Sequence, residues 1–261
     1  MSSLRHILIL LLAIAPQLLL AQKEKNEIPP VTFKGKITFE RKLNLHKQMD
    51  EMMKGNGGAN SAMADQLKKN ISKYKTDIFE MYFNDTKSLY KPAPDGISEV
   101  KMMMAGIPSE KNLVYNDFTQ GVYTSEKSIF EKTYLIQDSL KPFQWKITEE
   151  FRKIAGFNCR RAETVIMDSV YVVAFYTDAI MTNSGPENFS GLPGMILGIV
   201  MPRLNLTYFA TKVENYLPGE KDIVSPTKGV KKDQKELESD LRSSMKQWGA
   251  FLERILWYCM I

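Results

Sequence analysis

Alternating apolar and polar residues mark most of the chain after residue 30. Apolar side chains occupy every second position in residues 31–39, alternation recurs in residues 143–149 and 204–213, and further strand-like runs fall in residues 75–91, 112–137 and 159–177. A period of two places the apolar residues on one face of a β-strand. Short turn sequences separate neighbouring runs, which is typical of antiparallel hairpins. The pattern therefore predicts a mainly β protein.

A helical period interrupts this β pattern twice. Residues 44–74 carry apolar side chains at spacings of three and four, with a Gly/Asn-rich break after Lys54. A second stripe near the C-terminus comprises Leu237, Leu241, Met245, Trp248, Leu252 and Leu256. We therefore expect a helical insertion after the first strand and one long C-terminal helix packed on the sheet. The expected fold class is mainly β (α+β), a curved antiparallel sheet or half-barrel that carries these helices.

The N-terminus has the three parts of a secretory signal peptide. Arg5 lies before an apolar run, and the small residue Ala21 precedes polar Gln22. The alternative is an uncleaved anchor helix, but Pro16 breaks the apolar run, and a bilayer span needs about 20 residues. No cysteine lies near residue 22, so a bacterial lipid anchor is not indicated. The pattern predicts a soluble protein exported to the periplasm or outer envelope, without a transmembrane segment after cleavage.

The predicted organisation has three parts. They are a signal peptide at 1–21, a flexible leader at 22–30, and a single domain at 31–261 with an insertion at about 44–74. Hydrophobic residues make up 44% of the chain and aromatic residues 10%. This composition excludes wholesale disorder. The net charge of +5 falls to +4 when Arg5 is removed, because 34 basic residues then face 30 acidic ones. The excess is small and spread out, so nucleic acid is not an expected partner.

The chain has two cysteines, Cys159 and Cys259. Export would place them in a compartment where disulfides persist. A bridge between them would close a loop of about 100 residues and contribute roughly 4–5 kcal/mol in the chain-entropy model. Two buried free thiols are the alternative, and the sequence leaves both open.

Catalytic patterns are nearly absent from the sequence. Once the signal peptide is removed, His46 is the single histidine, and it lies in the predicted insertion. No phosphate-binding loop, GxSxG or HExxH motif is present. One histidine and two distant cysteines cannot form a zinc site of the usual kind. We therefore expect a non-enzymatic protein, with a hydrolase of unknown specificity built on His46 as one alternative.

Methionine is unusually frequent, with 15 residues. On a helix, His46, Met49 and Met53 would share one face, because they are three and four positions apart. Imidazole and thioether ligands suit Cu(I), so a periplasmic Cu(I)-handling protein is a second alternative. A further cluster occupies Met102–Met104. Methionine also fills adaptable apolar surfaces. Apart from Cu(I), no cofactor is expected.

The most specific local pattern is a glycine- and proline-rich corner before residues 195–201. Pro193 keeps Leu192 out of the helical conformation, and glycines permit positive φ angles. Leu192 would then act as an apolar plug where the chain enters a buried strand. The corner residues are Gly185, Pro186, Phe189, Gly191, Leu192, Pro193, Gly194, Ile196 and Leu197. We expect them to have a structural role.

At these residues the chain resembles the GLPGLI family, exported proteins of unassigned function from Bacteroidetes-type bacteria. The resemblance rests on Gly185–Leu197, on Ala174–Thr177, and on a Trp-x-Ile and Ile-x-Gly pattern within Trp145–Ala162. Met195 replaces a leucine of the family pattern and Phe175 a tryptophan. The match covers about residues 143–213. It implies an exported protein of antiparallel strands and brings no established catalytic residues.

The expected curved sheet and helix also resemble, at the level of fold alone, the half-barrel of periplasmic lipoprotein carriers. Those carriers hold acyl chains in an apolar concavity, and a shared fold supports only a hypothesis about function. Strand-borne Phe, Tyr and Met are abundant in this chain. The predicted function is therefore that of a non-enzymatic envelope protein that binds an apolar ligand or an envelope partner in its concave face.

Overall fold

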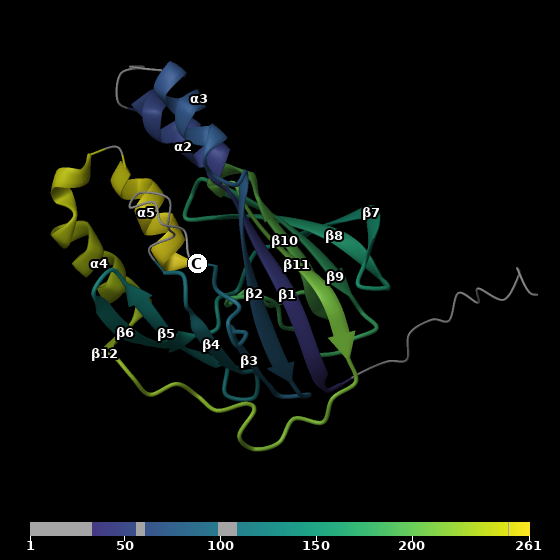
Figure 1. The fold of residues 1–261 in the computed structure, drawn as a ribbon. Helices are drawn as coiled ribbons and strands as arrows, with labels where there is room; N and C mark the ends of the chain where they lie inside the picture. Colours follow the sequence, from purple (N-terminus) through teal and green to yellow (C-terminus); the bar gives the residue numbers. More distant parts are fainter. Residues whose placement is uncertain (1–32, 56–60, 99–108, 250) are drawn as a thin grey trace, which may run out of the picture. The chain divides into compact units, whose positions relative to one another are not determined.

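The strands form one mixed sheet that is not closed (Figure 1). The computed structural model describes residues 33–55, 61–98, 109–249 and 251–261, leaving aside the side chains of 52–55, 61–64, 248 and 251. In this part of the chain, twelve strands follow the order β12-β6-β5-β4-β3-β2-β1-β11-β10-β9-β8-β7. Every neighbouring pair is antiparallel except β12 and β6, which are parallel. The expected mainly β fold is confirmed.

The chain builds this sheet as two meanders that meet at β1. The first runs outward through β1 (Gly35–Asn44), β2 (Tyr74–Phe83), β3 (Lys87–Pro92), β4 (Leu113–Asp117), β5 (Val122–Ile129) and β6 (Lys132–Ser139). The chain then crosses to the other edge. The second meander returns through β7 (Lys146–Ile154), β8 (Phe157–Ile166), β9 (Val170–Thr177), β10 (Met195–Met201) and β11 (Leu206–Glu214). Finally, β12 (Val230–Lys232) joins the outer side of β6.

The alternating apolar and polar residues of the sequence alternate between buried and exposed positions in the strands where the meanders meet. Buried and partly exposed residues alternate through most of β1 and β2. Phe39, Phe79 and Tyr90 are all fully buried, and the Phe79 and Tyr90 rings stack with centroids 4.7 Å apart. Burial of aromatic area of this kind stabilises a fold strongly. The inner face of these strands is therefore a packed core.

The expected helical insertion is confirmed. Two helices, α2 (Leu45–Gly55) and α3 (Ser61–Lys69), lie between β1 and β2. A 3₁₀ turn, η1 (Pro202–Leu204), separates β10 from β11. Within the described residues, no helix is both long enough and apolar enough to cross a membrane.

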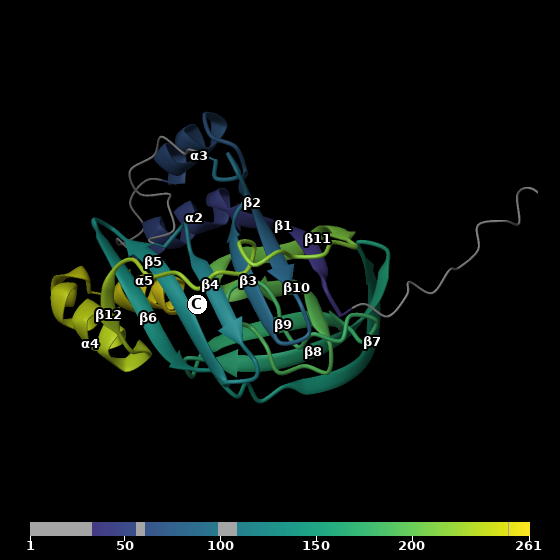
Figure 2. The ribbon, with the colours of Figure 1, turned by 90° about the horizontal axis from the view of Figure 1, so that it is seen from below.

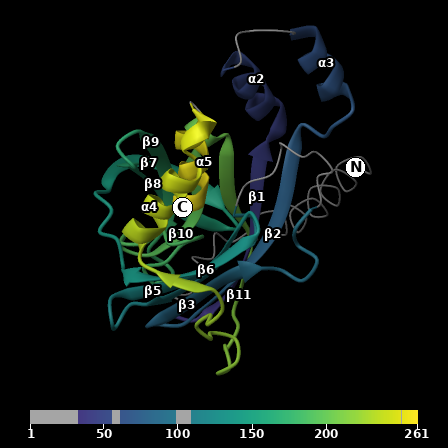
Figure 3. The same ribbon diagram turned by 90° about the vertical axis from the view of Figure 1, so that its left-hand side faces the viewer.

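The C-terminal stripe forms two helices where one was expected. They are α4 (Gln234–Ser244) and α5 (Phe251–Met260), separated by the 3₁₀ turn η2 (Lys246–Trp248). Gly249 has φ 55° and ψ −132°, which is not helical and is readily reached only by glycine. The periodicity continues through the break because both helices present apolar residues to β5 and β6. Figure 3 shows the two helices beside each other.

The end of α5 connects the two meanders. Tyr258 donates a hydrogen bond from its hydroxyl to the Leu204 carbonyl at 2.6 Å, and Ser109 donates to the Tyr258 carbonyl at 2.9 Å. Lys127 on β5 donates from Nζ to the Cys259 carbonyl at 3.2 Å and also to that of Ile261. Figure 2 shows this end between strands of the two meanders. The curvature of the sheet thus brings strands distant in the order to one place.

Candidate functional site

The glycine- and proline-rich corner enters the buried side of the sheet. All residues from Ser184 to Ser190 are buried. Glycine is required at two positions: a Cβ on Gly185 would lie 2.7 Å from the Ile196 Cβ, and one on Gly194, at φ +139°, would lie 2.1 Å from the Thr177 carbonyl oxygen. Leu192 is only 1% exposed. The corner has the geometry of an anchored turn with Leu192 inserted into the core.

The same corner carries Glu187 into the core. Its backbone has φ 55° and its side chain is buried. The Glu187 carboxylate accepts hydrogen bonds from Asn112 Nδ2 at 3.0 Å and from the Tyr208 hydroxyl at 3.2 Å. Burial, followed by the Glu187 charge, raises the pKa of Tyr208 and that of the adjacent Tyr90 well above the usual value. Glu187 therefore accepts hydrogen bonds from neutral neighbours.

A second buried charge cluster surrounds Asp77 on β2. Arg41 donates to Asp77 Oδ2 from Nη2 at 2.8 Å, and Lys75 donates to Oδ1 from Nζ at 2.7 Å. The Ser98 backbone N–H adds a bond to Oδ1 at 2.9 Å. Burial alone would raise the Asp77 pKa, but the Arg41 charge and the Lys75 hydrogen bond outweigh it, so the pKa is lowered. The Asp77 carboxylate is saturated with donors.

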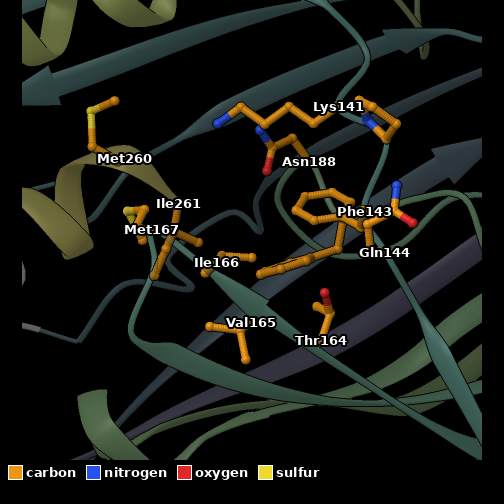
Figure 4. Close-up of a pocket in the computed structure, with 12 residues that line it drawn as sticks. Lys141, Phe143, Gln144, Thr164, Val165, Ile166, Met167, Asn188, Met260 and Ile261 are labelled. Carbon is orange, nitrogen blue, oxygen red and sulfur yellow. The ribbon is translucent and has the colours of Figure 1, made fainter.

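A cavity of about 250 Å³ opens where the crossover between the meanders meets the motif corner (Figure 4). Four segments line it: the β6–β7 crossover, the end of β8 with the following turn, the corner, and the last residues of the chain. The lining residues are Lys141, Pro142, Phe143, Gln144, Thr164, Val165, Ile166, Met167, Asn188, Phe189, Met260 and Ile261. The walls are mainly apolar, and the Phe143 and Phe189 rings lie 5.3 Å apart.

Two polar side chains at this cavity lack hydrogen-bond partners among the described residues. Lys141 makes no ion pair or side-chain hydrogen bond within the described part of the chain, and burial lowers its pKa. Asn188 is 7% exposed, and its amide likewise has no side-chain partner there. Figure 4 shows both side chains on one side of the cavity, opposite Thr164 and Val165. Lys141 is half-buried, and both side chains line the cavity, so their unpaired polar groups are open to contact with a ligand.

Lys127 contacts the last residues of the chain. Its side chain is buried, and burial lowers its pKa to about 8. Unlike Lys141, it has two acceptors, the carbonyl oxygens of Cys259 and Ile261. Lys127 therefore holds the C-terminal residues that form one wall of the cavity.

The residues proposed for Cu(I) are only partly described. His46 Nε2 lies 3.3 Å from the Ile71 carbonyl oxygen, which connects α2 to the segment before β2. The Met49 side chain is buried. The Met53 side chain and Met102–Met104 lie outside the described residues. No cluster of three or more His, Cys, Asp or Glu side chains suited to a metal occurs in the described part. Cu(I) binding stays a prediction.

The disulfide alternative is wrong in this structure, because Cys159 and Cys259 are both free and buried. Cys159 on β8 belongs to the core below the central strands, whereas Cys259 belongs to the cluster below α4 and α5. Burial raises the pKa of each thiol to about 12. Neither cysteine has the exposed, electropositive surroundings of a reactive thiol.

Comparison with known proteins adds a family match to one stretch. A family described as a protein of unknown function (Porph_ging) matches residues 163–198. This stretch contains cavity residues from both β8 and the corner, among them Thr164, Ile166 and Asn188. No curated protein matches the chain.

Solved structures similar to the chain include PNGF-II in two crystal forms. The form in space group C2 has 15% identity and a TM-score of 0.49, covering 87% of this chain and 33% of that one. The P21 form has 16% identity and a TM-score of 0.46, covering 77% and 32%. An uncharacterised conserved protein from Thermus thermophilus has 7% identity and a TM-score of 0.37, covering 84% and 99%. This chain spans about a third of the PNGF-II chain.

The sequence pattern indicates the corner but not the polar residues beside it. Glu187 and Asn188 were the two unspecified positions between Pro186 and Phe189. Lys141 stands in a connection between strands, where a lysine is usually solvated, so its sequence context does not mark it. Two adjacent polar residues, Glu187 and Asn188, in a run of otherwise small or apolar residues before a buried strand were the sequence feature that could have indicated a polar site.

Proposed function

We propose that this chain is an exported, non-catalytic envelope protein of the GLPGLI type that binds a small, mainly apolar ligand. The ligand occupies the cavity between the β6–β7 crossover and the corner. The observation that carries the proposal is the lining of this cavity, where Phe143, Ile166 and Met167 form apolar walls beside a few polar groups. Small-molecule sites are typically apolar hollows with a small number of placed polar groups.

The cavity replaces the open concave face as the expected binding place. Phe39, Phe79 and Tyr90 fill the inner face of the central strands and are fully buried. The cavity lies elsewhere and holds about 250 Å³. Because an engineered cavity of about 150 Å³ binds benzene, this larger cavity has room for a short aliphatic chain. A ligand of this size is a short-chain amphiphile.

The pattern of residues 1–21 and the family resemblance support export. The scarcity of histidine in the sequence supports a binding role over hydrolysis, since His46, on α2, has its Nε2 against the backbone carbonyl oxygen of Ile71. The match of residues 163–198 to a protein family supports a shared role for β8 and the corner.

Calorimetric titration with octan-1-ol tests the proposal. Each buried methylene contributes about 0.8 kcal/mol, so we expect one site with a Kd between micromolar and millimolar. In NMR spectra, octan-1-ol should shift the amide signals of residues 164–167. Native mass spectrometry of the protein from its own periplasm should show a bound small molecule.

A pair of substitutions locates the site. Ile166→Trp fills the cavity and should abolish the heat of binding. Tyr171→Trp adds an indole on an exposed β9 position and should leave it unchanged. Thermal melting identifies a variant that has unfolded, and the smaller Ile166→Phe then takes its place. Binding that survives cavity filling in a folded variant, or no saturable binding by the native chain, refutes the proposal.

A further inference from the structure

The polar end of the cavity carries one positive charge that no counter-charge among the described residues contacts. The Lys141 amine has two nearby carboxylates, those of Asp138 and Glu238, whose charges favour its protonated form. Both carboxylates are engaged elsewhere. Asp138 accepts from the backbone N–H groups of Ser139 at 2.7 Å and Gln234 at 3.2 Å. Glu238 pairs with Arg242 at 2.8 Å.

Asn188 adds a second donor at the same end. Its residue is 7% exposed, and its side-chain amide has no hydrogen-bond partner within the described residues. The Lys141 side chain extends past Asn188, so that the ammonium group and the amide lie on the same side of the cavity (Figure 4). An ammonium and an amide can both donate to one oxygen-bearing anion.

The other buried amine in this region is not available to a ligand. Lys127 Nζ donates to the backbone carbonyls of Cys259 and Ile261. In the part of the chain that the structure describes, the unmatched charge at the cavity is therefore that of Lys141. An anion with one negative charge complements it, and the apolar walls lie next to this position.

We propose that the cavity binds a monoanionic amphiphile, with its carboxylate on Lys141 and Asn188 and its chain against Phe143, Ile166 and Met167. This inference rests on the proposed function and names its ligand class, a short-chain saturated or branched carboxylic acid. The anionic group supplies the acceptor that both polar side chains lack, and hydrogen bonds between charged groups are the stronger ones.

The test compares ligands of one chain length and different heads. Calorimetry at pH 7 and low salt uses octanoate, octan-1-ol and octylammonium with the full chain. Octanoate should bind at least tenfold more tightly than octan-1-ol, and octylammonium more weakly than both. Octyl phosphate and octyl sulfate are titrated in the same way, as ligands with other anionic head groups. If either binds more than tenfold tighter than octanoate, the carboxylate assignment is overturned.

Variants assign the head group to its partners. Lys141→Met should weaken octanoate at least tenfold and leave octan-1-ol within threefold of the native value. Lys141→Arg should keep the preference for octanoate. Asn188→Ala should weaken octanoate by a smaller factor. Lys146→Met removes an exposed lysine on β7 nearby in sequence and serves as the matched control, which should bind as the native chain does.

The outcomes separate the two proposals. If neither octanoate nor octan-1-ol binds, the proposed function fails and the ligand class fails with it. If octan-1-ol binds and octanoate binds no better, the ligand class alone is overturned. Equal loss of both ligands in folded Lys141→Met also overturns it, because the lysine would then support the cavity wall and not the head group.

Discussion

Two polar regions of this protein differ in whether their side chains are paired. Around Asp77, every charge has a partner: Arg41, Lys75 and Ser98 donate to one carboxylate. At the cavity, Lys141 and Asn188 have none among the described residues. The Asp77 cluster is buried on β1 and β2, whereas Lys141 and Asn188 lie in loops at the cavity, where Lys141 is only half-buried. The two regions differ in the hydrogen-bond and ion-pair partners that surround their polar side chains.

The comparison distinguishes a polar group that holds the fold from one that is free to bind. A buried charge costs free energy unless it is paired and hydrogen-bonded. The Asp77 cluster meets this condition internally, so its removal should damage stability. Lys141 and Asn188 do not meet it, so they add little to stability and can contribute to binding. Substitutions at the two regions should therefore have opposite profiles.

The largest effect is expected for Asp77→Asn. The substitution leaves Arg41 and Lys75 buried without their shared carboxylate, which should cost about 3–5 kcal/mol in the free energy of unfolding. Urea denaturation at pH 7 measures the loss, and the exposed Asp85→Asn is the control. A loss below about 1 kcal/mol would show that the cluster is not structural.

The same residue gives the native protein an acid dependence. Its pKa in the folded chain lies below the ordinary aspartate value of 3.8. The stabilisation from Asp77 is therefore fully present above pH 3.8 and is lost as the pH falls through the folded value. The difference in stability between the native chain and Asp77→Asn should shrink in that window.

Lys127→Met should change how stability depends on pH at the alkaline side. The pKa of this lysine is about 8 in the folded chain, against an ordinary value of 10.5. Between these values the unfolded chain binds more protons, so the native protein gains stability as pH rises, on the order of 3 kcal/mol in total. Burial is the main cause, and the charges that act on this amine are those of Glu187, Lys141 and Cys259. If the free energy of unfolding depended on pH in the same way in the native chain and in Lys127→Met, the prediction would be contradicted.

Lys141→Met should leave stability unchanged or raise it by up to about 1 kcal/mol, because it removes a half-buried charge that has no partner among the described residues. Lys75→Met is the paired counterpart and should cost several times more, since it removes two bonds to Asp77. Urea denaturation of both variants gives the direct contrast. A loss above about 2 kcal/mol at Lys141 would mean that this amine stabilises the fold.

Asn188→Ala should have the smallest effect, below about 1 kcal/mol, because no side-chain hydrogen bond to a described residue is lost. Asn116→Ala is the matched comparison: this buried amide donates to the Ser88 hydroxyl at 3.2 Å, and its removal should cost about 1–3 kcal/mol. Thermal melting at equal protein concentration measures both. Equal losses of stability in Asn188→Ala and Asn116→Ala would contradict the distinction between the unpaired and the paired amide.

Local patterns predicted the elements of this fold well. The two-residue period of residues 31–39 corresponds to β1, although the described strand begins at Gly35 and extends to Asn44. In the hairpin between β7 and β8, Gly156 has the positive φ angle that glycine readily adopts, whereas Ala155 adopts a positive φ against its local preference. The apolar periodicity continues through Gly249 and therefore does not indicate the break between α4 and α5. The spacing of apolar side chains does not indicate the φ and ψ angles of a single residue.

The sequence by itself determined the mainly β character, the helical insertion, and the glycines and Leu192 of the corner, because each depends on neighbouring residues. Only the tertiary structure decided which polar groups are paired. Lys141, Ile166, Asn188 and Met260 lie far apart along the chain and meet because the two meanders curve toward the end of α5. Arg41, Lys75 and Asp77 find each other through the pairing of β1 with β2. The free energy of a buried charge depends on such neighbours, and sequence spacing does not contain them.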